Sequence, residues 1–95
     1  MRGMATLVID KKETFDDGTI VQIIVWTLPV PLIGSLHRYK YRLYCGKAGE
    51  CLVRFDNEQG KGDHTHINGQ EEPYRFKDIS TLLKDFWQAV ERIGE

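Results

Sequence analysis

The sequence has few of the features that mark secreted, membrane or nucleic-acid-coating proteins. Two cysteines in 95 residues are too few for a disulfide-stabilised scaffold. No apolar run approaches the roughly 18 residues that cross a bilayer, and residues 1–4 lack the apolar stretch of a secretory signal. Charge of one sign is not in excess, because 13 Lys+Arg oppose 14 Asp+Glu. We therefore expect a cytoplasmic protein that does not enter membranes.

The composition that is present fits one small globular domain. Hydrophobic residues make up 41% and charged residues 28%, and no repeat, linker or low-complexity tract divides the chain. The sequence thus predicts a single domain over residues 1–95. Charge is unevenly spread, since residues 36–77 carry eight cations, six anions and all three histidines, whereas both flanking segments are net negative. Functional chemistry is expected in this middle segment.

The first half of the chain has strand patterns. Residues 6–15 and 19–26 flank the turn sequence Asp16-Asp17-Gly18, and the second of these strands is apolar on both faces. This pattern is typical of a central strand that is covered on both sides. Residues 37–45 then alternate with period two, so that Tyr and Leu side chains share one face and cations share the other.

Residues 46–50 are predicted to form a hairpin loop that leads into a fourth strand over residues 51–56. Matching the apolar faces requires opposed residue numbers with an even sum, and a sum of 96 is the simplest choice. A shift by two residues stays open, whereas a shift by one would bury charge. Both cysteines are expected to be buried and reduced. The predicted pairs are Cys45–Cys51, Tyr41–Phe55, Lys40–Asp56 and Arg38–Glu58.

A polar, glycine-rich segment separates these strands from a C-terminal helix. Residues 57–70 read as a loop, with a short fifth strand around His64–Ile67 as an alternative. Asp78 is a predicted N-cap, and apolar residues then recur at three- and four-residue steps up to Ile93. The predicted fold class is α+β, with a four-stranded, or alternatively five-stranded, largely antiparallel sheet. The helix is expected to pack on the face of Tyr39, Tyr41, Leu43, Val53 and Phe55.

A cationic strand face is the first candidate for function. Arg38, Lys40 and Arg42 stand on alternate positions, about 6–7 Å apart by strand geometry, and could hold successive phosphates of a substrate. Glu58 is a further candidate substrate contact. The other interpretation is that these cations only keep the sheet soluble and pair with Asp56 and Glu58.

His64 and His66 are the second candidate, because an extended segment would point both imidazoles the same way. A histidine pair can donate and accept protons, as metal-free phosphodiester cleavage requires, with Asp56 orienting an imidazole and Lys61 stabilising phosphate charge. No cofactor is favoured, and the alternative is a Zn²⁺ or Mn²⁺ site in which His64 and His66 are joined by Asp63, or by Glu58 or Asp56. In a third interpretation the histidines are structural.

The adjacent carboxylates Glu71 and Glu72 precede a proline and suggest a fixed turn. They could pair with Arg38 or Arg42, or they could bind a cation. An ion-pair clasp that holds the preceding loop is the favoured interpretation.

Three segments together resemble the TumE family of small prokaryotic toxins from type II toxin–antitoxin modules. They are residues 37–42, the run Asp-Asn-Glu-Gln-Gly-Lys-Gly-Asp-His-Thr-His over residues 56–66, and Glu-Glu-Pro-Tyr-Arg-Phe over residues 71–76. The resemblance implies a growth-inhibiting toxin with a cognate antitoxin protein as partner. By analogy with other small toxins it implies action on RNA.

The functional hypothesis is thus a small, metal-independent ribonuclease whose catalytic residues are His64, His66, Lys61 and Asp56. The alternative is a non-catalytic module that binds RNA or a protein through the same surface, alone or as an oligomer.

Overall fold

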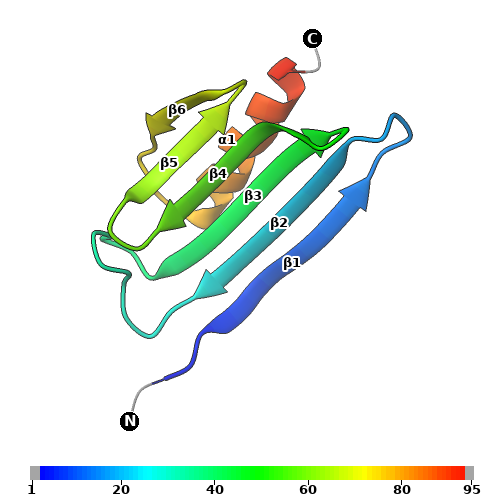
Figure 1. The fold of residues 1–95 in the computed structure, drawn as a ribbon. Helices are drawn as coiled ribbons and strands as arrows, with labels where there is room; N and C mark the ends of the chain where they lie inside the picture. The colour runs from blue at the N-terminus through cyan, green and yellow to red at the C-terminus, as the bar shows by residue number, and fades with distance from the viewer. Residues whose placement is uncertain (1–2, 94–95) are drawn as a thin grey trace.

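The computed structural model describes residues 3–93 as a six-stranded antiparallel sheet with one helix across one face (Figure 1). Every strand lies beside its neighbour in sequence. The elements are β1 (Thr6–Thr14), β2 (Ile20–Thr27), β3 (Tyr39–Lys47), β4 (Glu50–Glu58), β5 (Gly62–Ile67), β6 (Gln70–Pro73) and α1 (Ile79–Ile93). The predicted α+β class with one packed helix is confirmed. The predicted four or five strands are wrong, because the sheet has six.

Strands β5 and β6 form a hairpin, in which β5 matches the alternative of a fifth strand around His64–Ile67 and β6 extends beyond the predicted loop of residues 57–70. Asn68 and Gly69 connect them with φ angles of 53° and 84°. Two consecutive residues with positive φ make the tight turn that favours Asn-Gly, and this turn matches the twist of paired strands. His66 consequently lies opposite Glu71.

The register of β3 and β4 differs by two residues from the predicted one. Leu43 lies opposite Phe55 and Cys45 opposite Val53, and none of the four predicted pairs occurs between these two strands. The connection is a two-residue turn, Ala48–Gly49, and not a five-residue loop, because both residues adopt positive φ and the flanking residues stay paired. The register then shifts by one residue near Cys45, which is a β-bulge.

The bulge separates the two thiols. Cys45 is buried, whereas Cys51 lies opposite Gly46 and is only half-buried. Both thiols are free. The prediction that both cysteines are buried is therefore wrong for Cys51.

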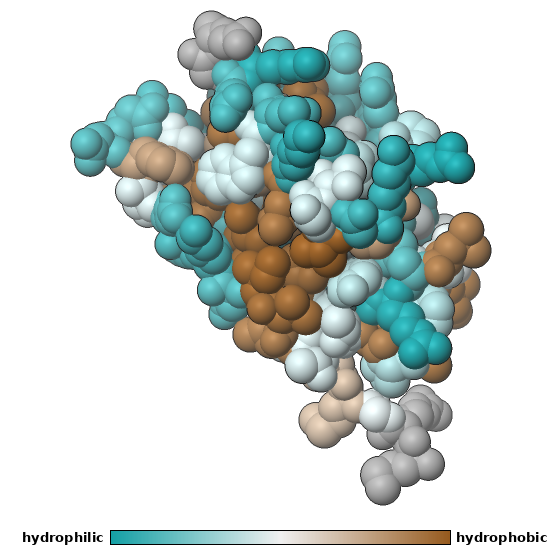
Figure 2. All heavy atoms as spheres, turned by 180° about the vertical axis from the view of Figure 1, so that it is seen from behind, coloured by the Kyte–Doolittle hydropathy of each residue, from teal (hydrophilic) through white to brown (hydrophobic). Residues whose placement is uncertain are grey.

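The helix covers the sheet face on which the core forms, which we call the covered face. Leu82 and Phe86 of α1 are fully buried, and the Phe86 ring meets Phe55 edge-on at 5.8 Å between centroids. Seen from the helix side, apolar side chains gather in the middle of this face (Figure 2). The predicted packing face is confirmed. The buried apolar residues are Val21, Ile23, Val25, Tyr41, Leu43, Cys45, Val53, Phe55, Leu82, Phe86 and Ala89.

The helix begins where the sequence predicts. The Asp78 carboxylate accepts a hydrogen bond of 2.7 Å from the Thr81 backbone N–H, as an N-cap does. This bond lowers the pKa of the Asp78 carboxyl. Neither the length nor the polarity of α1, the helix within residues 3–93, suits it to cross a bilayer.

The opposite face of the sheet, which we call the open face, carries no helix. The apolar residues of β2 on this side, Ile24 and Trp26, are half-buried, whereas Val21 and Val25 on the covered face are buried. The predicted cover on both sides of this strand is therefore wrong. The open side carries charged and imidazole side chains from three further strands, namely Lys40 and Arg42 of β3, Arg54 and Asp56 of β4, and His64 and His66 of β5.

Candidate functional site

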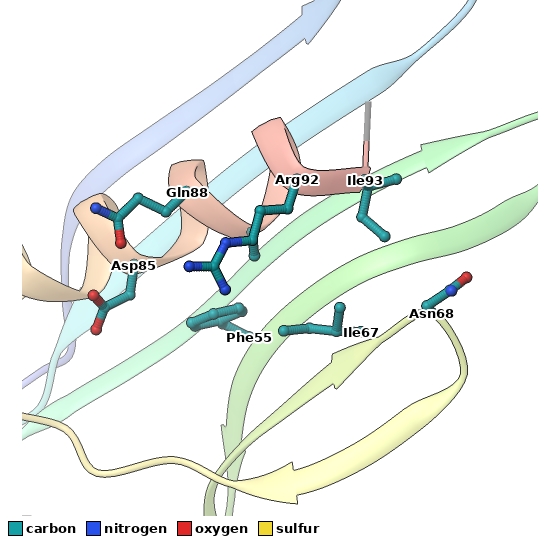
Figure 3. Close-up of a pocket in the computed structure, with 8 residues that line it drawn as sticks. Phe55, Ile67, Asn68, Asp85, Gln88, Arg92 and Ile93 are labelled. Carbon is teal, nitrogen blue, oxygen red and sulfur yellow. The ribbon is translucent and has the colours of Figure 1, made fainter. Parts of the chain in front are cut away.

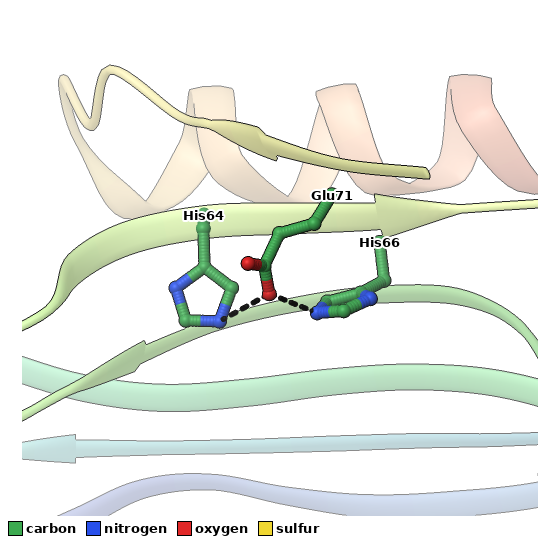
Figure 4. Close-up of side chains that lie close together, drawn as sticks. All are labelled: His64, His66 and Glu71. Atoms are coloured by element: carbon green, nitrogen blue, oxygen red, sulfur yellow. Dashed lines mark ion pairs between the residues drawn. The ribbon is translucent and has the colours of Figure 1, made fainter. Parts of the chain in front are cut away.

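Four titratable side chains from three neighbouring strands meet on the open face. His64 lies opposite Asp56 of β4, and His66 lies opposite Glu71 of β6. Opposed residues of antiparallel strands project to the same side, so the side chains converge. Figure 4 shows both imidazoles and the Glu71 carboxylate on the side of β5 away from the helix. We call Asp56, His64, His66 and Glu71 the histidine–carboxylate cluster.

The Nε2 atoms of both imidazoles face carboxylates. His64 Nε2 lies 2.7 Å from Asp56 Oδ1 and 3.9 Å from Glu71 Oε2. His66 Nε2 contacts the same Glu71 oxygen. The other ring nitrogen of His64, Nδ1, lies 3.3 Å from the Gly62 carbonyl oxygen, which can only accept, so Nδ1 carries a hydrogen.

The centre of the cluster is buried but incompletely hydrogen-bonded. The side chains of Asp56 and His64 are each only 10% exposed. Arg54 Nε lies 3.0 Å from Asp56 Oδ2, which is close enough for an ion pair. Arg54 Nε and Asp56 Oδ1 nevertheless lack a well-aligned hydrogen bond among the described residues. Each of these two atoms instead lies at ion-pair distance from a charged or ionisable partner.

The cations predicted to hold substrate lie beside the cluster on the open face. Arg42 is directly opposite Asp56, and Lys40 lies one alternate position further, opposite Trp26 of β2. The Arg42 guanidinium carbon is 5.2 Å from the centre of the Tyr44 ring, a cation–π distance. Arg38 precedes β3 and is exposed.

Lys61 and Glu58 lie at the turn between β4 and β5, at the edge of the site. Lys61 Nζ is 3.8 Å from Glu58 Oε2, and the two side chains are 71% and 52% exposed. Lys61 also borders a shallow depression of about 310 Å³ that reaches His64 and Glu71. It therefore stands on the rim of the site, and not against the imidazoles.

Asp63 is on the covered face, away from both cluster histidines. Its Oδ2 accepts hydrogen bonds from the Tyr41 hydroxyl at 2.7 Å and from His37 Nε2 at 2.8 Å. Burial, aided by the nearby Asp63 carboxylate, raises the pKa of Tyr41. The predicted metal-ligand set of Asp63, His64 and His66 is therefore not brought together.

The carboxylate that lies beside both His64 and His66 is that of Glu71 and not that of Asp63. The ligand atoms of His64, His66 and Glu71 all lie within 4.8 Å of one another, as do those of Asp56, Glu58 and His64. The predicted clasp between the Glu71–Glu72 pair and Arg38 or Arg42 is absent among the ion pairs of residues 3–93, where Glu71 pairs with histidines. The Asn-Gly turn was the signal that could have placed Glu71 here.

A second groove lies on the covered face, between α1 and strands β4 and β5 (Figure 3). It encloses about 320 Å³ but contains no histidine or cysteine among its lining residues. This groove therefore contains none of the residues of the histidine–carboxylate cluster. The lining residues are Phe55, Ile67, Asn68, Asp85, Gln88, Ala89, Arg92 and Ile93.

Comparison with known proteins gives the family. A family model described as toxin TumE matches residues 2–93. The chain belongs to the TumE toxin family. No curated protein and no solved structure matches it. TumE membership indicates a toxin role and an antitoxin partner.

Proposed function

We propose that this protein is the toxin of a type II toxin–antitoxin module and that it cleaves cytoplasmic RNA at the histidine–carboxylate cluster without a metal. The observation that carries this proposal is the placement of two imidazoles, each against a carboxylate, on a basic and uncovered sheet face. A cognate antitoxin protein would silence the activity. The proposal treats the cluster as an acid–base pair.

Metal-free RNA cleavage needs one base and one acid. A bond forms between the 2′ oxygen and phosphorus, and the bond from phosphorus to the 5′ oxygen breaks. His66 is the base: its Nε2–H donates to Glu71, which leaves the Nδ1 lone pair to take the 2′ proton. His64 is the acid: both of its nitrogens face acceptors, so Nε2 holds the proton that the leaving 5′ oxygen receives.

The charge on the reacting phosphate is stabilised by neighbouring guanidinium groups. Arg54 lies directly opposite His66, and Arg42 is opposite Asp56 on the next strand. Preorganised cations of this kind contribute much of the catalysis of phosphoryl chemistry. Lys40 and Lys61, on either side, would contact the flanking backbone.

The decisive experiment measures cleavage of a short RNA by purified protein in the presence of EDTA. We expect a 2′,3′-cyclic phosphate and a 5′ hydroxyl as products. The His66→Ala variant should be slower by about 10²–10⁴-fold, because it lacks the base. Glu72→Gln is the matched control, since Glu72 lies opposite Thr65 and therefore projects to the other side of β6. A folded His66→Ala variant with the wild-type rate would contradict the assignment.

A non-catalytic RNA-binding module is the second candidate. Half-buried Trp26 and Tyr44 lie among the cations of the open face, and aromatic rings among cations are what single-strand binders use for stacking. This candidate predicts RNA that is bound but intact. It also predicts that Arg42→Ala and His66→Ala weaken binding to a similar degree.

A further inference from the structure

We infer that the histidine–carboxylate cluster is a binding site for one divalent transition-metal cation such as Zn²⁺, with His64 Nε2, His66 Nε2 and a Glu71 carboxylate oxygen as ligands. The binding of the cation is independent of the proposed ribonuclease activity. Only its consequence for cleavage rests on that proposal.

The first argument is the choice and placement of ligand atoms. Two imidazole nitrogens and one carboxylate form a set that Zn²⁺ accepts in proteins, with a fourth position left for water. The three ligand atoms lie within 4.8 Å of one another, and His64 Nε2 is 3.9 Å from Glu71 Oε2. Ligands at about 2.0–2.2 Å from a tetrahedral cation are separated by distances of this order. Small side-chain rotations therefore suffice to close the site.

The second argument is the support behind His64. Its Nδ1–H faces the Gly62 carbonyl, so in the neutral ring the lone pair is on Nε2 and points into the cluster. A histidine that binds a metal typically donates its other N–H to a carbonyl or carboxylate in this way. Because Gly62 and His64 both belong to β5, the backbone itself fixes this orientation.

The third argument is the unsatisfied charge inside the cluster. Asp56 Oδ1 is buried, lies 2.7 Å from the same Nε2 atom and lacks an aligned hydrogen bond in the described part of the chain. Glu71 pairs there with the two histidines and with no lysine or arginine. If the imidazole Nε2 atoms carried no proton, their lone pairs would face the lone pairs of the carboxylate oxygens. A cation held by His64, His66 and Glu71 would offset the negative charge of the cluster, including that of the adjacent Asp56 carboxylate.

Selectivity follows from the same atoms. Imidazole nitrogen suits Zn²⁺, whereas Mg²⁺ prefers an all-oxygen shell with several retained waters. We therefore expect the site to bind Zn²⁺ far more tightly than Mg²⁺. Since His64 Nε2 cannot hold a cation and donate a proton at once, bound Zn²⁺ should inhibit the metal-free cleavage proposed above.

The test is calorimetric titration of the metal-free full-length protein with Zn²⁺ alone, and with Mg²⁺ for comparison. We expect one Zn²⁺ per chain, and a loss of affinity of at least about 10–100-fold in His66→Gln and in Glu71→Gln, as a lost ligand should cost no less than a lost supporting contact. Glu72→Gln should bind as the wild type does. Absence of Zn²⁺ binding by the wild type, or equal binding by Glu71→Gln, would overturn the inference.

A melting experiment guards against variants that fail to fold. Zn²⁺ should raise the Tm of the wild type and of Glu72→Gln, and leave that of Glu71→Gln unchanged, because only a ligand that binds the folded state stabilises it. RNA cleavage in EDTA separates the two proposals. Cleavage without Zn²⁺ binding overturns the metal site alone, and Zn²⁺ binding without any cleavage overturns the ribonuclease alone.

Discussion

Strand β5 contributes Asp63 and His64 to two histidine–aspartate pairs of nearly equal length on opposite faces of the sheet. On the covered face, His37 Nε2 lies 2.8 Å from Asp63, and on the open face His64 Nε2 lies 2.7 Å from Asp56. In the first pair Asp63 Oδ2 and both His37 ring nitrogens have hydrogen-bond partners, because Tyr41 also donates to Asp63 and His37 Nδ1 accepts the Tyr39 N–H at 3.1 Å.

The second pair, His64 and Asp56, lacks this complete set of hydrogen bonds among the described residues. Asp56 Oδ1 and Arg54 Nε are buried without aligned hydrogen bonds, although both lie at ion-pair distances from partners. Saturated polar networks stabilise a core, whereas incomplete ones are costly unless they do something else. A histidine–aspartate distance alone therefore does not indicate function, and the remaining hydrogen-bonding capacity is the better guide.

The largest expected effect comes from removing core packing on the covered face, where the helix lies on the sheet. Phe86→Ala empties the centre of the covered face, where the ring is fully buried. We expect the free energy of unfolding to fall by about 3–5 kcal/mol, as for other buried Phe truncations. Urea denaturation measures this. A small loss would mean that the helix contributes little to the core.

The two aspartates provide the sharpest comparison. Asp63→Asn weakens two charged hydrogen bonds, so unfolding free energy should fall by about 1–3 kcal/mol while RNA cleavage by the folded protein stays unchanged. Asp56→Asn should reduce cleavage by at least about tenfold with a stability loss near 1 kcal/mol. Denaturation and cleavage assays on both variants test this, and the contrast fails if Asp63→Asn is the variant that loses activity.

Tyr41→Phe probes the covered-face network more gently. The pKa of Tyr41 is raised, so its hydroxyl remains protonated and donates to Asp63 throughout the physiological pH range. Removing this one bond should cost about 0.5–1.5 kcal/mol of unfolding free energy, because His37 still satisfies Asp63. Thermal denaturation reports the change. No change at all would show that Asp63 does not need both donors.

The smallest expected effect concerns the two thiols, which should differ in their rate of labelling. Burial raises the pKa of the Cys45 thiol, so both access and thiolate content are reduced. Cys51 is half-buried. We expect a thiol reagent to label Cys51 first and Cys45 slowly in the native protein, as followed by mass spectrometry of the Cys51→Ser and Cys45→Ser variants. Equal rates would contradict the β-bulge between them.

The period-two and helical patterns were sufficient to predict the packing face and the helix start. Tyr41, Leu43 and Phe55 alternate with neighbours of the other face, so burial of one sheet face determines which of these side chains point toward the helix. The register could not be derived in this way, because a shift by two residues preserves the faces. It depends on the turn at Ala48, where a left-handed alanine is unusual and carries no sequence signal.

The candidate site was predicted in part. Alternation placed His64 and His66 on one side, and their prediction as the centre of function stays a prediction. Asp63 was paired with them by proximity in sequence, although adjacent strand residues project to opposite faces. Glu71 was missed as a partner because its position depends on the β5–β6 hairpin, for which only the Asn-Gly pair gives a local signal.

The order of elements along the chain has a consequence for synthesis. Each strand pairs with the one made just before it, so the sheet can form with short loop closures while the polypeptide is still being translated. The helix follows all six strands, and its 15 residues take about 1–3 s to make at typical translation rates. Until α1 is made and packed, it cannot cover Leu43 and Phe55. A nascent sheet in this state exposes an apolar surface that chaperones can recognise before the toxin is complete.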